Sequence, residues 1–310
     1  MPGLPLFRIH LLAQLEILKH VDTLDIITLT FCSERTRALV ESAKIQLKQL
    51  NFKFLRSDGV DIRVNEDYYM TAQFTAIEGS NKSVKVIWRY CFQDEKVVLF
   101  RSASGHDSLE KMLTDHLMKT FKNAKVMKVY SYRTGAQNIP IWKYRKTIDI
   151  FSFCCDREEK LSEEELNFIL GELTINRYLQ IHPPVIDGFR FSAGFQQKAV
   201  YIEHANWVHF DAILNSQSQV INLKGIEKPS AVQLNTMLKL WISMEKMQNL
   251  EWLQMVLPSG EEFEEEFFTE VLDGIVHVED FQLAEFRRVD GKLAEVFVFD
   301  IMGICFRTLN

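Results

Sequence analysis

The chain has 310 residues, and 42 acidic against 36 basic residues give it a formal net charge of -6. Hydrophobic residues make up 47% and charged residues 25%, an ordinary balance for a globular protein that excludes disorder as the dominant state. The mild acidity does not favour nucleic-acid binding, and no window approaches the ~18 consecutive apolar residues of a membrane helix. Five scattered cysteines without a C-x-x-C pair favour reduced thiols in the cytoplasm or nucleus.

The first 50 residues show helical periodicity. Leu11, Leu15 and Leu18 follow one another at spacings of four and three, which predicts a short helix with one apolar face. A second short helix is expected over residues 24–31. Ser33 is a suitable N-cap for a third helix.

From residue 52 to residue 101 the pattern changes to period two. Val84, Val86 and Trp88 alternate with other residues, and the region is rich in β-branched and aromatic side chains. Both features are typical of strands. The Gly79-Ser80-Asn81 tripeptide predicts a turn between two of them.

After residue 105, helices and strands alternate. Capping boxes at Asp107 with Glu110 and at Ser162 with Glu165 predict two helix starts, and further helices are expected at 207–214 and 231–247. Strands are expected at 126–130, 148–153, 200–202, 220–223 and 250–255. An Asp290-Gly291 pair between two strand-like runs predicts a closing hairpin with φ above zero at both residues.

Two of the expected strands share one spacing of apolar residues. Ile148-x-x-Phe151-x-Phe153 and Leu250-x-x-Leu253-x-Met255 have the form of a leucine-rich-repeat strand, and strands recur at roughly 20–30 residues. Buried parallel strands of an unrelated α/β sheet give the same pattern. We therefore predict an α/β chain, α+β overall, whose body is either an irregular leucine-rich-repeat-like stack or another α/β sheet.

The residues that could carry chemistry do not form a recognisable site. His204 and His209 are five apart, which places them on different faces of a helix, and the cysteines lack zinc-ligand spacing. The glutamates between residues 261 and 266 fit the first turns of a helix capped by Ser259 better than a metal or basic-partner site. We expect no catalytic residues, no metal and no cofactor, although spatially assembled catalytic groups are not excluded by sequence.

The segment from residue 6 to residue 44 resembles an F-box. Ile17-Leu18 match the Ile-Leu pair of that family, and Cys32-Ser33 with two arginines match its third helix. His10 stands where the family has proline, and Thr36 stands where it often has an aromatic residue.

A second resemblance lies near the C-terminus. Residues 234–242, with the sequence LNTMLKLWI, and Leu250-Glu251-Trp252-Leu253 resemble the F-box-associated type-2 region of the large nematode family of F-box proteins. Residues 287–292 fit the end of that region. The resemblance implies an F-box domain at 1–50, a mostly β connecting region at 51–105 and an associated α/β repeat-like substrate-binding region at 106–310.

The two resemblances imply the substrate-recognition subunit of a Skp–cullin–F-box (SCF) ubiquitin ligase. The helices would bind a Skp-type adaptor, and through it a cullin, while the C-terminal body would bind an unknown target protein. The residues that we expect to contact the adaptor are Ile9, His10, Leu12, Ile17, Leu18, Val21, Leu24, Ile27, Leu29 and Cys32.

The physical chemistry of the first helices agrees with such an interface. A domain of about 45 residues buries a small fraction of its surface, so its apolar residues exceed what three short helices can hide. The alternative is that these residues pack against the rest of the chain. Three functions remain open, namely a ligase receptor, an interaction scaffold whose F-box does not bind the adaptor, and an enzyme on the α/β body.

Overall fold

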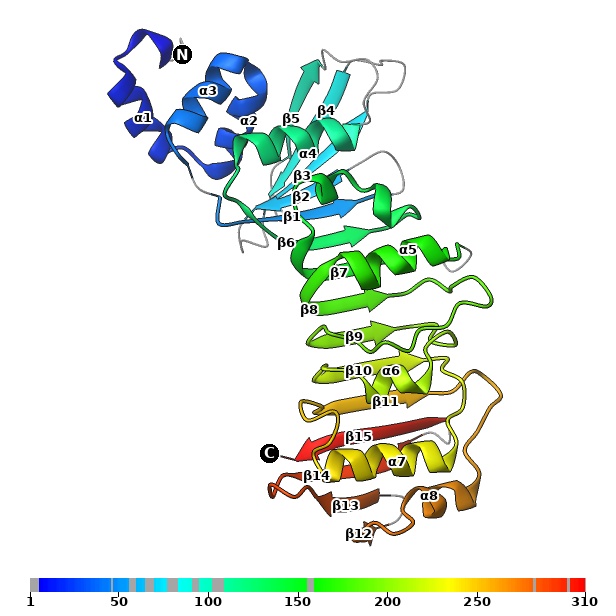
Figure 1. The fold of residues 1–310 in the computed structure, drawn as a ribbon. Helices are drawn as coiled ribbons and strands as arrows, with labels where there is room; N and C mark the ends of the chain where they lie inside the picture. Colours follow the sequence, from blue (N-terminus) through cyan, green and yellow to red (C-terminus); the bar gives the residue numbers. More distant parts are fainter. Residues whose placement is uncertain are drawn as a thin grey trace. The chain divides into compact units, whose positions relative to one another are not determined.

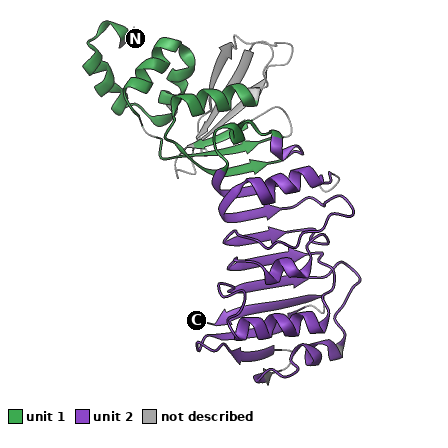
Figure 2. Ribbon diagram, viewed as in Figure 1, with its two compact units in different colours: residues 1–132, 138–146 green, residues 133–137, 147–310 purple. Residues whose placement is uncertain are grey.

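The computed structural model describes residues 6–45, 47–55, 60–64, 70–76, 83–90, 95–101, 109–154, 159–280, 283–299 and 302–309. The chain divides into two compact units (Figure 2). Unit 1 comprises residues 1–132 and 138–146, and unit 2 comprises residues 133–137 and 147–310. The regions expected at 1–50 and 51–105 lie in unit 1, whereas the region expected at 106–310 includes parts of both units.

Unit 1 begins with short helices that pack on one another, as the apolar periodicity predicts. Leu18, Ile27, Leu39 and Val40 form their buried core and are at most 7% exposed. The helices are η1 (Leu6–Arg8), α1 (Leu11–Lys19), α2 (Thr23–Cys32) and α3 (Glu34–Ser42).

The remainder of unit 1 is a mixed sheet with one long helix. The strand order is β6-β1-β2-β3-β4-β5, in which β1 and β6 are parallel and the other neighbours are antiparallel. The strands are β1 (Gln49–Phe54), β2 (Val60–Val64), β3 (Met70–Ala76), β4 (Ser83–Tyr90), β5 (Glu95–Arg101) and β6 (Lys125–Ser131). Helix α4 (Leu109–Thr120) buries Leu113 and Leu117, and a 3-10 turn, η3 (Pro140–Lys143), contacts it.

Unit 2 is built on a second run of strands (Figure 1). The order β7-β8-β9-β10-β11 is parallel, and β15, β14, β13 and β12 continue it in antiparallel pairing. The parallel strands are β7 (Thr147–Phe153), β8 (Thr174–Ile181), β9 (Ala199–Ile202), β10 (Val220–Lys224) and β11 (Trp252–Val256). The antiparallel strands are β12 (His277–Asp280), β13 (Leu283–Arg287), β14 (Leu293–Phe299) and β15 (Gly303–Leu309).

Short helices connect these strands. They are α5 (Glu163–Asn167), which continues as the π-helical turn η4 (Phe168–Glu172), then α6 (Phe210–Leu214), α7 (Ala231–Ile242) and α8 (Glu265–Val271). A further 3-10 turn is η2 (Ala136–Asn138). Figure 1 shows α5, α6 and α7 on the same face of the sheet. Leu234 and Leu238 of α7 line one small internal cavity together with Leu253 and Met255 of β11, so this face is the buried one.

The register aligns apolar residues of the parallel strands into two inner columns, all at most 2% exposed. One column is Phe151, Leu179, Val200, Ile221 and Leu253, and the other is Phe153, Ile181, Ile202, Leu223 and Met255. Strands β9, β10 and β11 alternate between buried and half-buried residues, as expected when helices cover one face only. The fold is thus mixed α/β with a large sheet. That its body is a leucine-rich-repeat variant remains a prediction.

Several sequence expectations need correction. Strand β8 was not predicted, because its polar face interrupts the apolar pattern. Helix α8 begins at Glu265 with Glu264 as N-cap, so Ser259 does not cap it. The hairpin between β13 and β14 is present, but the positive φ is at Gly291 (94°) and not at Asp290. The Gly79-Ser80-Asn81 turn and Asp107 lie outside the described residues.

Candidate functional site

The first turn of α1 presents two large apolar side chains to solvent. Leu11 is 53% exposed and Leu12 is 70% exposed. They are among the few exposed large hydrophobic residues of the described chain, and they are adjacent. Exposing two leucines in water is unfavourable unless a partner covers them. The adaptor contacts predicted from the sequence include Leu12 but not Leu11, which the helical periodicity places on the apolar face of the helix.

The other residues expected to contact the adaptor differ in how far their side chains are buried. Leu18 and Ile27 are 1% and 2% exposed, so their side chains belong to the core of the helices and do not form a free surface. The side chain of Leu24 lies outside the described part of the structure. Those at least partly accessible are Ile9, His10, Ile17, Val21, Leu29 and Cys32.

The two departures from the F-box pattern have local structural roles. Nδ1 of His10 accepts a hydrogen bond from the backbone N–H of Leu12 at 3.3 Å, so His10 caps α1. Thr36 forms a capping box with Ser33 at the start of α3 and is 7% exposed. Side chains of this kind satisfy the free N–H groups of a helix start. His10 therefore stabilises α1, which carries Leu11 and Leu12, and Thr36 stabilises α3.

Two contacts fix the chain before α1. The guanidinium of Arg35 lies 4.2 Å from the centroid of the Phe7 ring, within cation–π range. Nε2 of Gln14 donates a hydrogen bond of 2.7 Å to the carbonyl of Ile9. The position of the exposed leucines is thus set by packing on both sides of them.

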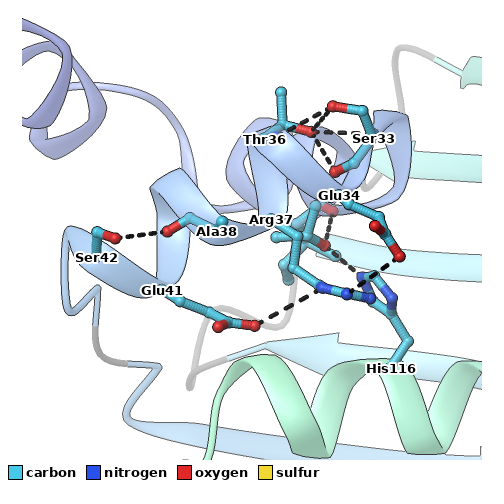
Figure 3. A network of polar contacts seen from close by, with 10 residues as sticks. Ser33, Glu34, Thr36, Arg37, Ala38, Glu41, Ser42 and His116 are labelled. Carbon is cyan, nitrogen blue, oxygen red and sulfur yellow. Dashed lines mark hydrogen bonds and ion pairs between the residues drawn. The ribbon is translucent and has the colours of Figure 1, made fainter. Parts of the chain in front are cut away.

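His116 of α4 contacts helix α2 (Figure 3). Nε2 of His116 lies 2.8 Å from Oγ1 of Thr30, and its ring stacks on Phe31 with a centroid separation of 3.9 Å. Burial, and secondarily the charge of Arg37, lowers the pKa of His116 to about 4. Figure 3 shows Arg37 beside this ring, between the carboxylates of Glu34 and Glu41. His116 is therefore neutral at pH 7 and joins the helical part of unit 1 to its sheet-covering helix.

The conspicuous LNTMLKLWI stretch of unit 2 forms α7. Leu234, Leu238 and Trp241 are buried against the sheet. Nδ2 of Asn235 donates hydrogen bonds of 2.8 Å to the carbonyls of both Val271 and Asp273, at the end of α8. Val271 is the last residue of α8 and Asp273 follows it, and carbonyls at a helix end need partners from outside the helix, which the asparagine supplies. The motif is thus explained by packing and helix attachment rather than by chemistry.

Neither of two hollows in unit 2 brings together a nucleophile and a base. The cavity under α7 is lined by apolar side chains. A hollow beside α5 is open and contains Glu163, Glu164 and Glu172. Among the described residues, no group of three or more His, Cys, Asp or Glu side chains could hold a metal ion. Within the same residues, no helix is long and apolar enough to span a membrane.

Two family models match parts of the chain. Residues 6–48 match the family model described as F-box domain, and residues 194–255 match the model described as F-box associated. The second match begins at Gly194 and spans β9, α6, β10, α7 and β11. No curated protein and no solved structure matches the chain.

These two families restrict the function. An F-box domain generally binds a Skp-type adaptor and, through it, a cullin. Proteins with F-box and F-box-associated regions are generally non-catalytic substrate adaptors, and together the two regions suggest an SCF substrate-adaptor-type role. The chain thus contains an F-box domain at residues 6–48, which carries the exposed leucines of α1, and an F-box-associated region at residues 194–255.

Proposed function

We propose that this chain is a non-catalytic substrate-recognition subunit of an SCF-type ubiquitin ligase. Its F-box would bind the Skp-type adaptor, and unit 2 would bind a target protein. Holding a target beside the ubiquitin-transfer machinery accelerates transfer by proximity, so no catalytic group is required in this chain.

The observation that carries the proposal is the exposure of Leu11 and Leu12 within the segment that matches the F-box. Apolar side chains buried at the centre of an interface contribute most of its binding energy. We propose an adaptor-binding surface of Leu11 and Leu12 with the accessible members of the expected set, which are Ile9, His10, Ile17, Val21, Leu29 and Cys32. Leu18 and Ile27 would support this surface from below, and Leu24 stays a prediction.

Other parts of the proposal rest on the resemblances and on sequence patterns. These are the relation to nematode F-box proteins, the leucine-rich-repeat-like character of the body, and the regions 1–50, 51–105 and 106–310. Residence in the cytoplasm or nucleus belongs to the same proposal. The aligned inner columns of unit 2 support the repeat-like body, because each strand–helix unit buries its apolar side chains against its neighbours.

The test is a binding titration of the full chain with a purified Skp-type adaptor. Leu12 is the second residue of α1, and an aspartate there favours the helix dipole, so Leu12→Asp should leave the helix folded. We expect its affinity to fall by about tenfold or more. Val232, 74% exposed, is also the second residue of a helix, α7, and Val232→Asp is the matched control with unchanged affinity.

Two results would argue against the proposal in different ways. If Leu12→Asp and Val232→Asp bind equally well, the adaptor uses another surface. If the wild-type chain binds no adaptor although it is folded, the alternative gains, namely a protein-interaction scaffold whose F-box no longer engages the ligase. The departures at His10 and Thr36 are the observations that favour this alternative.

A further inference from the structure

The face of the unit 2 sheet opposite its helices carries two rows of side chains across the five parallel strands. Its apolar row is Ile150, Tyr178, Ala199, Val220 and Trp252, and its amide row is Ser152, Gln180, Tyr201, Asn222 and Gln254. Nine of these ten residues are half-buried, and the small Ser152 is buried. Among the described helices of unit 2, α5, α6 and α7 lie on the other face (Figure 1).

The composition of these two rows is that of an interface core. None of the ten side chains is charged, although a quarter of the chain is. Two tyrosines and a tryptophan lie among them, and the rings of Tyr178 and Tyr201 are 5.0 Å apart. Depletion of charge with enrichment in Tyr and Trp distinguishes the core of a protein–protein interface from other surface.

Charged residues occur instead at the borders of the rows. Lys224 pairs with Glu203 at 3.1 Å at the carboxyl ends of β9 and β10. Arg307 of β15, which lies opposite Trp252, pairs with Glu295 of β14. In both pairs the positive charge is compensated by a neighbouring carboxylate. A polar, charged rim around an uncharged centre is the usual anatomy of a binding surface.

The amide row is fixed by its own hydrogen bonds. Nδ2 of Asn222 donates to Oε1 of Gln254 at 2.8 Å, and the hydroxyl of Ser152 donates to Oε1 of Gln180 at 3.0 Å. Each such bond uses only part of the hydrogen-bonding capacity of an amide, which has two donors and an acceptor with two lone pairs. The remaining donors and acceptors can bond to the amide groups of another polypeptide.

We propose that this face, the open face, binds the target protein, and that the bound element is an uncharged polypeptide segment with one apolar side. The proposal rests on the receptor function proposed above. Apolar side chains of the segment would cover the apolar row, while its amides would bond to the amide row. A charged segment would lose its hydration without meeting an opposite charge, which is costly.

The dimensions of the open face set the length of this segment. Five strands span four spacings of ~4.8 Å, or about 19 Å, which an extended chain crosses with about six residues. A random library of peptides about twice that length can therefore supply the probe. The full chain is immobilised, and enriched peptides are titrated against it individually.

The decisive variant is Gln254→Glu, which adds a charge to the open face with almost no change in shape. The carboxylate keeps the acceptor for Asn222, so the sheet should fold normally. We expect peptides selected on the wild type to bind Gln254→Glu about tenfold more weakly, and Trp252→Ala to weaken them by a similar or larger factor. Selection on Gln254→Glu should enrich lysine and arginine relative to selection on the wild type.

The matched control is Gln233→Glu on α7, where the side-chain oxygen accepts the N–H of Ser230 in a capping box. A glutamate serves that role equally well, so binding should not change. If no peptide is enriched on the wild type, if enriched peptides are themselves highly charged, or if Gln254→Glu and Gln233→Glu behave alike, the proposal is overturned. Concentration-dependent dimerisation through this face would overturn it too, because the occupant would then be a second copy.

The two proposals fail separately. Leu12→Asp should lose the adaptor and keep the selected peptides, whereas Gln254→Glu should keep the adaptor and lose them. A chain that binds peptides at this face but no adaptor would refute the ligase function and leave the binding face intact.

Discussion

Nε2 of His116 lies 2.8 Å from Oγ1 of Thr30, and this contact between α4 and α2 joins residues 86 positions apart in the chain. The hydroxyl of Thr30 also donates to the carbonyl of Ile27 at 2.6 Å. With that proton used, the hydroxyl oxygen accepts, and Nε2 of a neutral imidazole is the donor. An uncharged histidine of α4 therefore forms one of the contacts between the F-box helices and the rest of unit 1.

This histidine should make the stability of unit 1 depend on pH. Its pKa is about 4 in the folded chain against 6.5 ordinarily, so between these values the unfolded state binds the additional proton. Stability should decrease as the pH falls from about 6.5 to about 4, by up to about 3 kcal/mol at 1.36 kcal/mol per pKa unit. Denaturant unfolding at a series of pH values measures this.

His116→Phe is the control, because it keeps an aromatic ring against Phe31 and removes the titration. Its unfolding free energy should be lower at pH 7 by about 1 kcal/mol, the value of the lost hydrogen bond. It should also lack the decrease between pH 6.5 and 4 that the wild type shows. Parallel pH profiles for the two proteins would contradict the assignment.

Leu12 and Leu18 lie on the same helix, but truncation to alanine should affect adaptor binding at Leu12 and folding stability at Leu18. Leu18→Ala removes a buried side chain and should cost about 2–5 kcal/mol of unfolding free energy. Leu12→Ala removes an exposed one and should change stability by less than about 0.5 kcal/mol while weakening adaptor binding. Unfolding curves and adaptor titrations of both variants separate the two roles. An equal loss of stability in the two variants would show that the Leu12 side chain is packed against the protein and not exposed to solvent.

Glu165 should be important for the stability of unit 2. It is 4% exposed, and its two carboxylate oxygens accept hydrogen bonds from the backbone N–H groups of Ala136 (3.1 Å) and Ser162 (3.1 Å), as well as from Gly135. An amide has only one such oxygen. Glu165→Gln should therefore cost about 2 kcal/mol, while the exposed neighbour Glu164→Gln should be neutral in the same unfolding measurement.

Gly194 and Gly188 offer a paired test of backbone fit. Their φ angles are 92° and 91°, so alanine is strained at both, by about 1 kcal/mol. A Cβ at Gly194 would lie 2.4 Å from the carbonyl oxygen of Asn215, whereas one at Gly188 would meet nothing within 4 Å. Gly194→Ala should cost about 1–3 kcal/mol more than Gly188→Ala in thermal or denaturant unfolding, because of this overlap. Equal losses would show that the loop moves aside.

Local patterns predicted those elements whose signals are local. The predicted capping box at Ser162 begins α5, α7 begins at Ala231 as expected, and the strands over 148–153 and 220–223 agree with β7 and β10 within a residue or two. Helix α7 ends at Ile242 rather than at Met247, because Met244 and Met247 adopt φ of 62° and 51°. Positive φ at non-glycine residues depends on packing that periodicity does not record.

The candidate site was only half visible in the sequence. The resemblance identified the F-box helices, but an apolar helical stripe cannot show which side of α1 is covered. Leu18 turned out to be core and Leu11 surface, because α3 packs on the face that carries Gln14 and Leu18. The open face of unit 2 could not be predicted from the sequence, for a different reason. Its two rows are assembled from five strands and follow from register, which no single segment encodes.

The Asp290-Gly291 pair forms the predicted hairpin turn, but the backbone of Asp290 does not have the predicted positive φ. The carboxylate of Asp290 accepts hydrogen bonds from Nε and Nη2 of Arg288 at 2.9 and 2.6 Å, and these bonds lower its pKa to about 2. Arg288 in turn lies 4.8 Å from the ring of Trp241. The aspartate is held by this side-chain contact, which connects the hairpin to α7 and which the dipeptide alone does not reveal.

Residues alternate along β9, β10 and β11 between buried side chains, which stabilise the fold, and half-buried side chains on the open face. Substituting Tyr201 or Asn222 leaves the ladder bonds and the apolar columns beneath them untouched. If the open face binds the target as proposed, substitutions on it would change what is recognised while the fold is kept, whereas substitutions in the buried half of each strand would disturb the packing. Two proteins with nearly the same buried residues could in this way bind different targets.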